Sequence, residues 1–217
     1  MLTETWLTSN QFTSELFDLS NYTVFRKDRC NLLTGMEKGG GILIAIRSSL
    51  SCKQVNLLSN NNISEAKIDI DQLIVALLFN NNIEVFVMLS YIPPRSSLEV
   101  YNIHFNNCKN ILENLNNFQH VICIGDFNQG NINWILDLDE KYFVPYNVNS
   151  EIEESIIDFY SQFDLIQINS FVNDNLRLLD LVFVDKEFFI VIEKSDLPLI
   201  QNSIHHVALE AKQTLMQ

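Results

Sequence analysis

The spacing of apolar residues constrains the fold of this chain more than any other feature of its sequence. Apolar residues recur mostly in short strand-like runs, bounded by glycine or asparagine turns. Residues 39–41 are three glycines followed by ILIAI, which is typical of a turn that enters a buried strand. Runs at 67–79 and 83–90 flank the asparagine turn at 80–82, so they are predicted to form an antiparallel hairpin. The segment VICIG, at 121–125, predicts another buried strand.

Two segments have helical periodicity instead. From Leu98 to Leu115 the apolar residues recur at steps of three and four, and Ser97 is the expected N-cap. A second amphipathic helix is predicted over about 151–163. Short strands are expected after it, at about 178–184, 189–194 and 206–211. Strict alternation of strand and helix is absent, so a doubly wound parallel sheet is not expected. The pattern predicts an α/β fold in which two mixed sheets pack together with helices outside, a layered sandwich.

Composition favours one folded domain over residues 1–217. The chain is 47% hydrophobic and 19% charged, which is typical of a globular protein. No apolar run is long enough to cross a bilayer, and the N-terminus lacks the pattern of a signal peptide, so we expect an intracellular protein with no membrane partner. The four cysteines are far apart and predict neither a zinc site nor a disulfide framework.

The net charge of −13 argues against a protein that holds nucleic acid mainly by electrostatic attraction. Lysine and arginine are sparse and scattered along the chain. An acidic balance is compatible with a protein that binds divalent cations, without establishing that it does so.

Polar residues at the ends of predicted strands are candidates for a functional site. Asp126 and Asn128 directly follow VICIG, and alternation along extended chain allows both side chains to point the same way. Together they could hold a cation-bound water or a phosphate oxygen, although a simple turn is the alternative. Tyr91 ends another predicted strand; its hydroxyl could donate to an anion, or the ring could simply pack.

Three further polar positions are less easily placed. Asp180 interrupts the apolar run LLDLVFVD and needs a partner, because burying an unpaired carboxylate is costly. His205 and His206 begin the last predicted strand, and either could be that partner. Glu4, in LTETWL, would by itself be interpreted as a surface residue.

In combination these motifs resemble a known family. The order LTETWL, a glycine turn before an apolar strand, SYIPP, GDFNQGNINW, LDLVF and a final His-x-x-Leu is similar to the endonuclease/exonuclease/phosphatase superfamily. More narrowly, it resembles the apurinic-endonuclease-like domain of insect-type non-LTR retrotransposons, over nearly the whole chain. The resemblance implies a four-layered α/β sandwich. It also implies that the first strand and helix of that domain are missing before Met1.

The resemblance assigns a role to each matching residue. Glu4 would bind Mg²⁺, or Mn²⁺ in its place, and Tyr91 would contact the scissile phosphate. Asp126 would position or activate the attacking water, and Asn128 would hold that water and the phosphate. Asp180 would orient a catalytic histidine, which would donate to the phosphoryl oxygen.

The identity of that histidine is left open between two neighbours. The family motif is Ser-Asp-His with an apolar residue three positions later, and Leu209 stands three after His206, which favours His206. His205 then occupies the place of the motif's aspartate; if His205 were the catalytic residue, Ile204 would occupy it. Either alignment lacks that aspartate.

Two functions follow as expectations. The first is a Mg²⁺-dependent phosphodiesterase that nicks DNA and leaves a 3′-hydroxyl, located in the nucleus if it acts on genomic DNA. The reverse transcriptase domain of an intact element would be its partner, but it is absent from this chain. The alternative is a catalytically inactive remnant, or a domain kept as a binding module with the same fold.

Overall fold

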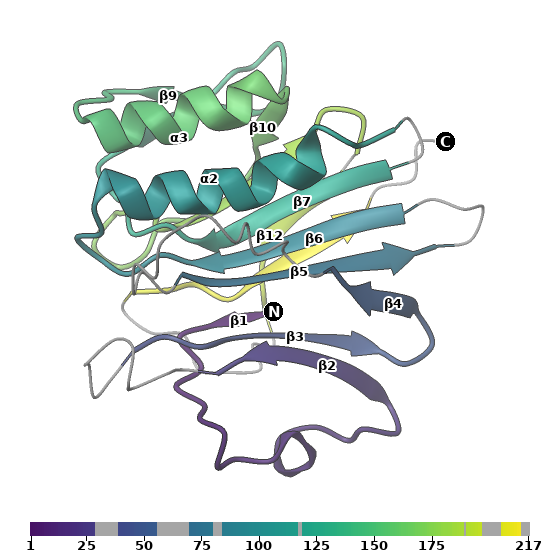
Figure 1. Cartoon of the computed structure of the whole chain (residues 1–217). Helices are drawn as coiled ribbons and strands as arrows, with labels where there is room; N and C mark the ends of the chain where they lie inside the picture. The colour runs from purple at the N-terminus through teal and green to yellow at the C-terminus, as the bar shows by residue number, and fades with distance from the viewer. Residues whose placement is uncertain are drawn as a thin grey trace.

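The computed structural model describes residues 1–28, 39–55, 70–79, 84–116, 119–188, 190–196 and 205–213 (Figure 1). At its centre lies one mixed sheet of eight strands. In spatial order these are β4 (Ser51–Gln54), β5 (Asp71–Leu78), β6 (Glu84–Tyr91), β7 (Gln119–Asp126), β11 (Asp180–Asp185), β10 (Leu165–Gln167), β9 (Phe143–Tyr146) and β8 (Asn133–Leu136). Strands β6 and β7 are parallel, and every other neighbouring pair in this sheet is antiparallel.

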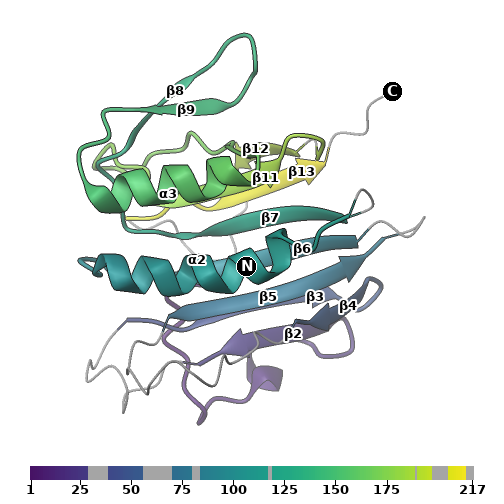
Figure 2. The same ribbon diagram turned by 45° about the horizontal axis from the view of Figure 1, so that its top comes forward.

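Two helices cover one face of this sheet (Figures 1 and 2). Helix α2 (Leu98–Leu112) connects the parallel strands β6 and β7, and α3 (Glu151–Gln162) lies beside α2. Helix α2 begins after Ser97, as predicted, but ends before Leu115. The N-cap of α3 is Ser150, whose hydroxyl accepts a hydrogen bond from the Glu153 backbone N–H.

The opposite face of the large sheet packs against further strands. A three-stranded antiparallel sheet has the order β1 (Leu2–Thr3), β3 (Ile42–Arg47), β2 (Tyr22–Lys27). A separate antiparallel hairpin consists of β12 (Ile190–Lys194) and β13 (Leu209–Gln213), and it lies behind β6 and β7 in Figure 1. A single 3₁₀ turn, η1 (Thr13–Glu15), precedes β2.

Alternation along the central strands supplies two cores. On β7, Val121 and Cys123 belong to the core under the helices, whereas Ile122 and Ile124 pack into the core between the sheets. The central strands are therefore buried on both faces, which explains why their sequences are continuously apolar.

The predicted fold class is confirmed: a layered α/β sandwich built on a mixed sheet. The described residues form a helical layer, the large sheet and a second layer of strands. That second layer differs from the prediction, since it consists of two antiparallel pieces and not of one mixed sheet. No helix in the described ranges is long and apolar enough to cross a membrane.

Individual strands were predicted unevenly. The hairpin partners β5 and β6 pair antiparallel in the structure, while residues 67–69 and the turn at 80–82 lie outside the described residues. The last strand was placed too early, because it begins at Leu209 and not at His206. Strands β8, β9 and β10 were not predicted, since each has four residues or fewer and little alternation.

Gly125 permits the close approach of the parallel strands β6 and β7. A Cβ at this position would lie 2.1 Å from the backbone oxygen of Ser90. We expect Gly125→Ala to lower the free energy of unfolding by about 3 kcal/mol, since neither backbone can yield within the sheet. Urea denaturation followed by circular dichroism measures this loss.

Gly130→Ala is the matched control. A Cβ there meets side-chain atoms of Leu179 and Arg177, which can move more readily than a strand backbone. An equal or larger loss in Gly130→Ala would contradict the close-approach explanation.

Candidate active site

A row of polar residues crosses four adjacent strands at one end of the large sheet. Tyr91, the last residue of β6, pairs with Asp71 on β5 and with Asp126 on β7. Asp126 pairs in turn with Asp180, the first residue of β11. Residues that pair directly share a face of the sheet, here the face toward the second layer of strands. The register therefore gathers these side chains at one end of the interface between the two layers.

His206 completes this cluster from the second layer. Its Nδ1 lies 2.9 Å from Asp180 Oδ2, and its Nε2 lies 3.6 Å from Asp126 Oδ2. The same Nε2 is 3.9 Å from Glu4 Oε2. The imidazole is thus bound by Asp180 on one side and faces two carboxylates on the other.

Glu4 joins the site through Tyr91. The Tyr91 hydroxyl donates a 2.9 Å hydrogen bond to Glu4 Oε1. Gly39 lies beside this pair, since a Cβ on Gly39 would lie 3.8 Å from the Tyr91 hydroxyl and 3.9 Å from Glu4 Oε1. Segments from near the N-terminus, from β6 and from the glycine turn therefore meet at one point.

Asn128 reaches the site by a turn and not by strand alternation. Strand β7 ends at Asp126, and Asn128 has a left-handed backbone with φ 52°. Its backbone N–H donates to Asp126 Oδ1 at 3.0 Å, and its side-chain amide donates to Asp126 Oδ2 and to the Ile92 carbonyl, each at 2.9 Å. The side chains of Asp126 and Asn128 lie together as predicted. They do so because of the turn at Asn128, and not because of alternation along a strand as expected.

Burial and neighbouring charges shift the protonation of this cluster. Burial raises the pKa of Asp126 to about 7; the Asp180 charge adds to the rise, and His206 opposes it. The hydrogen bond that His206 donates to Asp180 raises the pKa of His206 to about 9, against the effect of its burial. Burial, followed by the hydrogen bond to Glu4, raises the pKa of Tyr91 above its usual value. Near neutral pH the histidine is protonated while Asp126 can exchange a proton.

The alternative histidine lies outside the cluster. His205 is exposed, and its backbone carbonyl accepts a 3.0 Å hydrogen bond from the buried Asn173 side chain. In the structure His206, and not His205, is the histidine that lies beside Glu4 and Asp180.

Sequence reasoning missed the residues that support the site. Asp71 is buried, and its carboxylate accepts a 2.5 Å hydrogen bond from the Gly41 backbone N–H. The buried Asn169 side chain donates to the Asp180 backbone oxygen at 2.6 Å. The sequence did contain a signal for Asp71. It is an acidic residue at the start of an apolar strand, as Asp180 is on β11.

Tyr101, another missed residue, braces the turn that carries Asn128. Its fully buried hydroxyl donates to the Phe127 carbonyl at 2.6 Å and accepts from the Gln129 side-chain amide at 2.8 Å. These two contacts flank Asn128 on both sides. Its position on the buried face of α2 gave no sign of this role, because a tyrosine there is also what core packing requires.

The donor set suits a hard divalent cation. Ligand atoms from Asp126, Asp180 and His206 lie within 4.8 Å of one another. Glu4 adds a further carboxylate oxygen beside His206. Burial, followed by the charge of Asp180, raises the pKa of Asp126, and a bound cation would favour its charged form.

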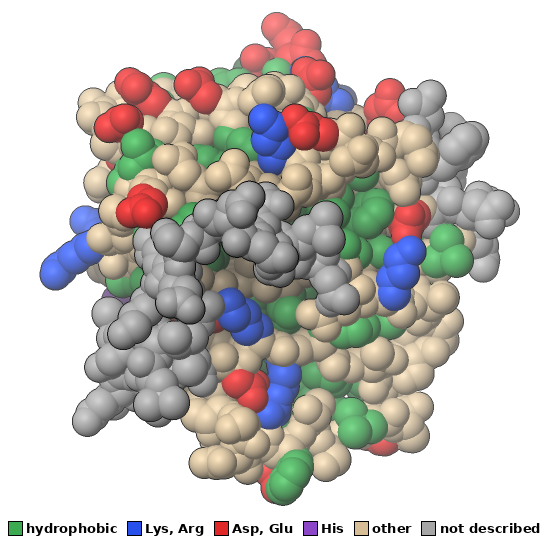
Figure 3. Space-filling view, in the orientation of Figure 1, with side chains coloured by type: hydrophobic (Ala, Val, Ile, Leu, Met, Phe, Trp, Pro, Cys, Tyr) green, Lys and Arg blue, Asp and Glu red, His purple; other side chains and the backbone are tan. Residues whose placement is uncertain are grey.

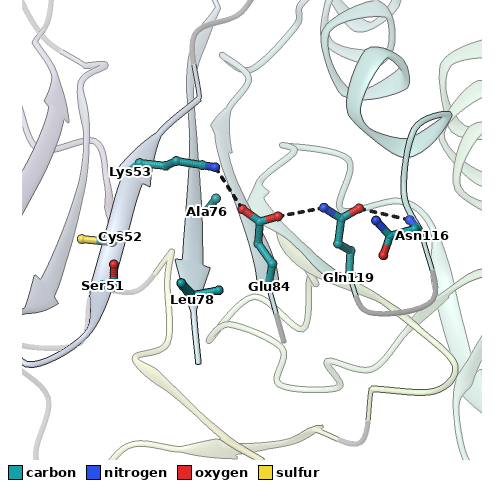
Figure 4. Close-up of a pocket in the computed structure, with 8 residues that line it drawn as sticks. All are labelled: Ser51, Cys52, Lys53, Ala76, Leu78, Glu84, Asn116 and Gln119. Carbon is teal, nitrogen blue, oxygen red and sulfur yellow. Dashed lines mark hydrogen bonds and ion pairs between the residues drawn. The ribbon is translucent and has the colours of Figure 1, made fainter. Parts of the chain in front are cut away.

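A separate hollow lies at the opposite end of the same sheet (Figure 4). It has a volume of about 340 Å³, and its walls include Glu84 and Gln119, the first residues of β6 and β7. Glu84 is bound by Lys53 at 3.3 Å and by the Gln119 amide at 2.7 Å. Glu84 is thus paired with a cation and a hydrogen-bond donor inside the hollow. The hollow is remote from Tyr91 and Asp126, which end the same two strands.

Solved structures share this arrangement of layers. The 3′ phosphatase NExo from Neisseria, bound to a product DNA hairpin, has a TM-score of 0.58 at 11% identity, over 98% of this chain and 87% of that one. An AP endonuclease from Archaeoglobus fulgidus has a TM-score of 0.58 at 12% identity, with the same coverage of 98% and 87%. The human Nocturnin catalytic domain with bound sulfate has a TM-score of 0.53 at 14% identity, over 92% of this chain and 73% of that one.

The chain has the endonuclease/exonuclease/phosphatase fold. These neighbours belong to that superfamily. No family model matches the sequence. No curated protein matches it either. At 11–14% identity the similarity shows the fold.

The pairing of His206 with Asp180 can be tested by titration. In metal-free protein we expect the pKa of the His206 imidazole to lie well above its usual value of 6.5, at about 9. Asp180→Asn should lower that pKa, because it removes the carboxylate that stabilises the charged ring. Two-dimensional NMR of the histidine ring protons against pH, in EDTA, measures both values.

His104 is the internal control. Its burial lowers its pKa to about 3, so its signals should not shift across neutral pH in either protein. An unchanged His206 titration in Asp180→Asn would contradict the pairing.

The hydrogen bonds of Tyr101 to the turn around Asn128 lead to a second prediction. Tyr101→Phe should lower the free energy of unfolding by about 1–2 kcal/mol, because it leaves the Phe127 carbonyl without its buried donor. The backbone amide of Asn128 should also exchange faster with solvent. Urea denaturation and hydrogen exchange by NMR are the measurements. Tyr146→Phe, at an exposed position, is the matched control.

Proposed function

We propose that this chain is a Mg²⁺-dependent phosphodiesterase that nicks DNA. The proposal rests on one observation: six polar side chains meet at one end of the central sheet. They are Glu4, Tyr91, Asp126, Asn128, Asp180 and His206. These residues come from distant parts of the chain, and core packing alone would not require so many charges at one place. The fold shared with nucleases and phosphatases supports the same class of reaction.

Each side chain suits one part of a hydrolytic displacement at phosphorus. Asp126 can accept the proton of an attacking water, because its pKa of about 7 lies near neutral pH. The Asn128 amide donates to Asp126 and to the Ile92 carbonyl, and its oxygen would accept a hydrogen bond from that water and so orient it. The water oxygen bonds to phosphorus as its proton passes to Asp126, the bond from phosphorus to the 3′ oxygen breaks, and the departing oxygen takes a proton from solvent, so that a 3′-hydroxyl and a 5′-phosphate result.

Positive charge on His206 would stabilise the phosphoryl oxygens as negative charge develops on them. Asp180 keeps the ring protonated and fixes its orientation through Nδ1, which leaves Nε2 directed at Asp126 and Glu4. The Tyr91 hydroxyl, which donates to Glu4 in this structure, would donate to the phosphate instead once Glu4 holds the metal ion. The reaction needs no covalent intermediate, since a metal ion, hydrogen-bond donors and a positioned water suffice.

The carboxylate of Glu4 would hold the metal ion. Mg²⁺, or Mn²⁺ in its place, prefers oxygen ligands and would supply Lewis-acid polarisation of a phosphoryl oxygen. His206 Nδ1 is engaged by Asp180, so we assign the ring to the phosphate and not to the metal.

DNA is the proposed substrate because of the motif resemblance. GDFNQGNINW, LTETWL and LDLVF resemble the endonuclease domain of insect-type non-LTR retrotransposons, which would make this chain a derivative of such an element. The Neisseria phosphatase with a DNA hairpin supports DNA as a ligand of this fold. A reverse transcriptase domain would then be the natural partner, and the nucleus the natural location.

One observation favours an inactive remnant or a binding module. His205 occupies the place where the family motif has an aspartate, and it is exposed beside the cluster. A missing carboxylate at such a position commonly lowers a rate by orders of magnitude. Activity must therefore be measured directly.

The decisive experiment is nicking of supercoiled plasmid by the purified chain, with Mg²⁺ and with EDTA. We expect Mg²⁺-dependent conversion to open circles, and at least about 100-fold slower conversion by Asp126→Asn. In EDTA at pH 8 that variant should lose no more than about 1 kcal/mol of stability, because it removes a buried charge that other carboxylates repel.

Asp158→Asn, on the exposed surface of α3, is the matched control and should nick at the parent rate. Intact plasmid from a demonstrably folded parent protein would refute the nuclease and leave the binding module. Equal nicking by Asp126→Asn would refute its assigned role.

A further inference from the structure

Trp6 is a large aromatic side chain left in solvent at the edge of the candidate site. It is 51% exposed, although a tryptophan normally buries most of its ring. Two residues along an extended chain span at most about 7 Å, so its backbone lies close to that of Glu4. None of the assigned catalytic roles uses it.

The backbone holds Trp6 firmly in place. Thr5 and Trp6 donate backbone hydrogen bonds of 3.0 Å to the carbonyls of Gly41 and Gly40. Glu4 and Trp6 both have left-handed backbones, with φ 51° and 54°. Such conformations are costly for residues other than glycine and concentrate at functional sites. Gly39, the neighbour of Gly40, is the residue that lies beside Glu4 and Tyr91. Trp6 is therefore hydrogen-bonded to the glycine segment, residues 39–41, that borders the candidate site.

The acidic charge of the protein favours an aromatic contribution to the binding of a polyanionic substrate. The chain carries 14 basic and 27 acidic residues. On the face drawn in Figure 3, lysine and arginine side chains are scattered among acidic ones and do not gather into a patch. Neutralisation of phosphates cannot supply much affinity here. Stacking of bases on aromatic rings does not depend on protein charge.

We propose that Trp6 is a stacking platform for an unstacked nucleobase next to the scissile phosphate. The proposal rests on the nucleic-acid substrate of the proposed function. It implies a preference for single-stranded or locally unpaired DNA over intact duplex, because a base paired and stacked within a duplex cannot present its face to the indole.

Binding is tested without cleavage, with Ca²⁺ in place of Mg²⁺. The probe is a short single-stranded DNA oligonucleotide, compared with the same sequence as a blunt duplex. Trp134→Phe serves as the parent protein, since it leaves Trp6 as the one remaining tryptophan. We expect the single strand to quench the Trp6 fluorescence and to bind more tightly than the duplex. In fluorescence anisotropy with a labelled oligonucleotide, Trp6→Ala should bind about 5- to 150-fold more weakly, and Trp6→Phe should recover part of that loss.

Phe12→Ala is the matched control, because Phe12 is also an exposed aromatic, at 68%, in the same N-terminal segment. Equal affinity of parent and Trp6→Ala, or an equal loss in Phe12→Ala, would overturn the proposal. Circular dichroism checks that each variant is folded.

Plasmid nicking separates this proposal from the proposed function. Nicking by the parent with unchanged affinity in Trp6→Ala would leave the nuclease and refute the platform. Quenching and Trp6-dependent binding without any nicking would leave the platform and refute the nuclease. Absence of DNA binding in every form of the protein would refute both.

Discussion

The pairing register of β5, β6, β7 and β11 is the constraint on which the site depends. It sets Asp71, Tyr91, Asp126 and Asp180 in one row across the sheet, all on the face toward the second layer. A slip of one residue in any strand would turn its polar residue toward the helices and its apolar residues toward the wrong core. Gly125 allows the parallel pair at the centre of the row to approach closely. The stability of the sheet and the geometry of the cluster are therefore consequences of the same hydrogen-bond ladder.

Carboxylates crowded at the end of a buried interface define the chemistry that the site can support. Burial raises the pKa of Asp126, whereas the hydrogen bond donated to Asp180 raises the pKa of His206. The same environment thus yields one carboxylate able to exchange a proton near neutral pH and one persistently charged imidazole. Carboxylates held close together repel one another, and a bound divalent cation would relieve that repulsion. The supporting contacts of Asp71, Asn169 and Tyr101 hold the participants in place without touching a substrate.

The acidic surface and the proposed nucleic-acid substrate are compatible if affinity arises locally. A metal ion, two or three hydrogen-bond donors and one exposed indole can bind a short stretch of nucleic acid without a basic surface. Such a protein would favour unpaired nucleotides and would associate slowly, since its overall charge repels the polymer. Trp6 and the Glu4–Tyr91 pair both lie beside the glycine segment at residues 39–41, so recognition and the proposed reaction would use the same part of the protein.

The sequence by itself determined the two amphipathic helices, most of the long buried strands and the polar residues that end them. Periodicity is local, so these features could be predicted from neighbouring residues. The motif order also indicated the fold and pointed to Asp126, Asn128, Asp180 and the histidine pair. Tertiary structure decided which histidine meets Asp180, that Asn128 arrives by a left-handed turn, and that Asp71 and Tyr101 support the site. The short strands β8 to β10 likewise exist through pairing with neighbours. These features depend on register and on packing between segments distant in sequence, which no local pattern encodes.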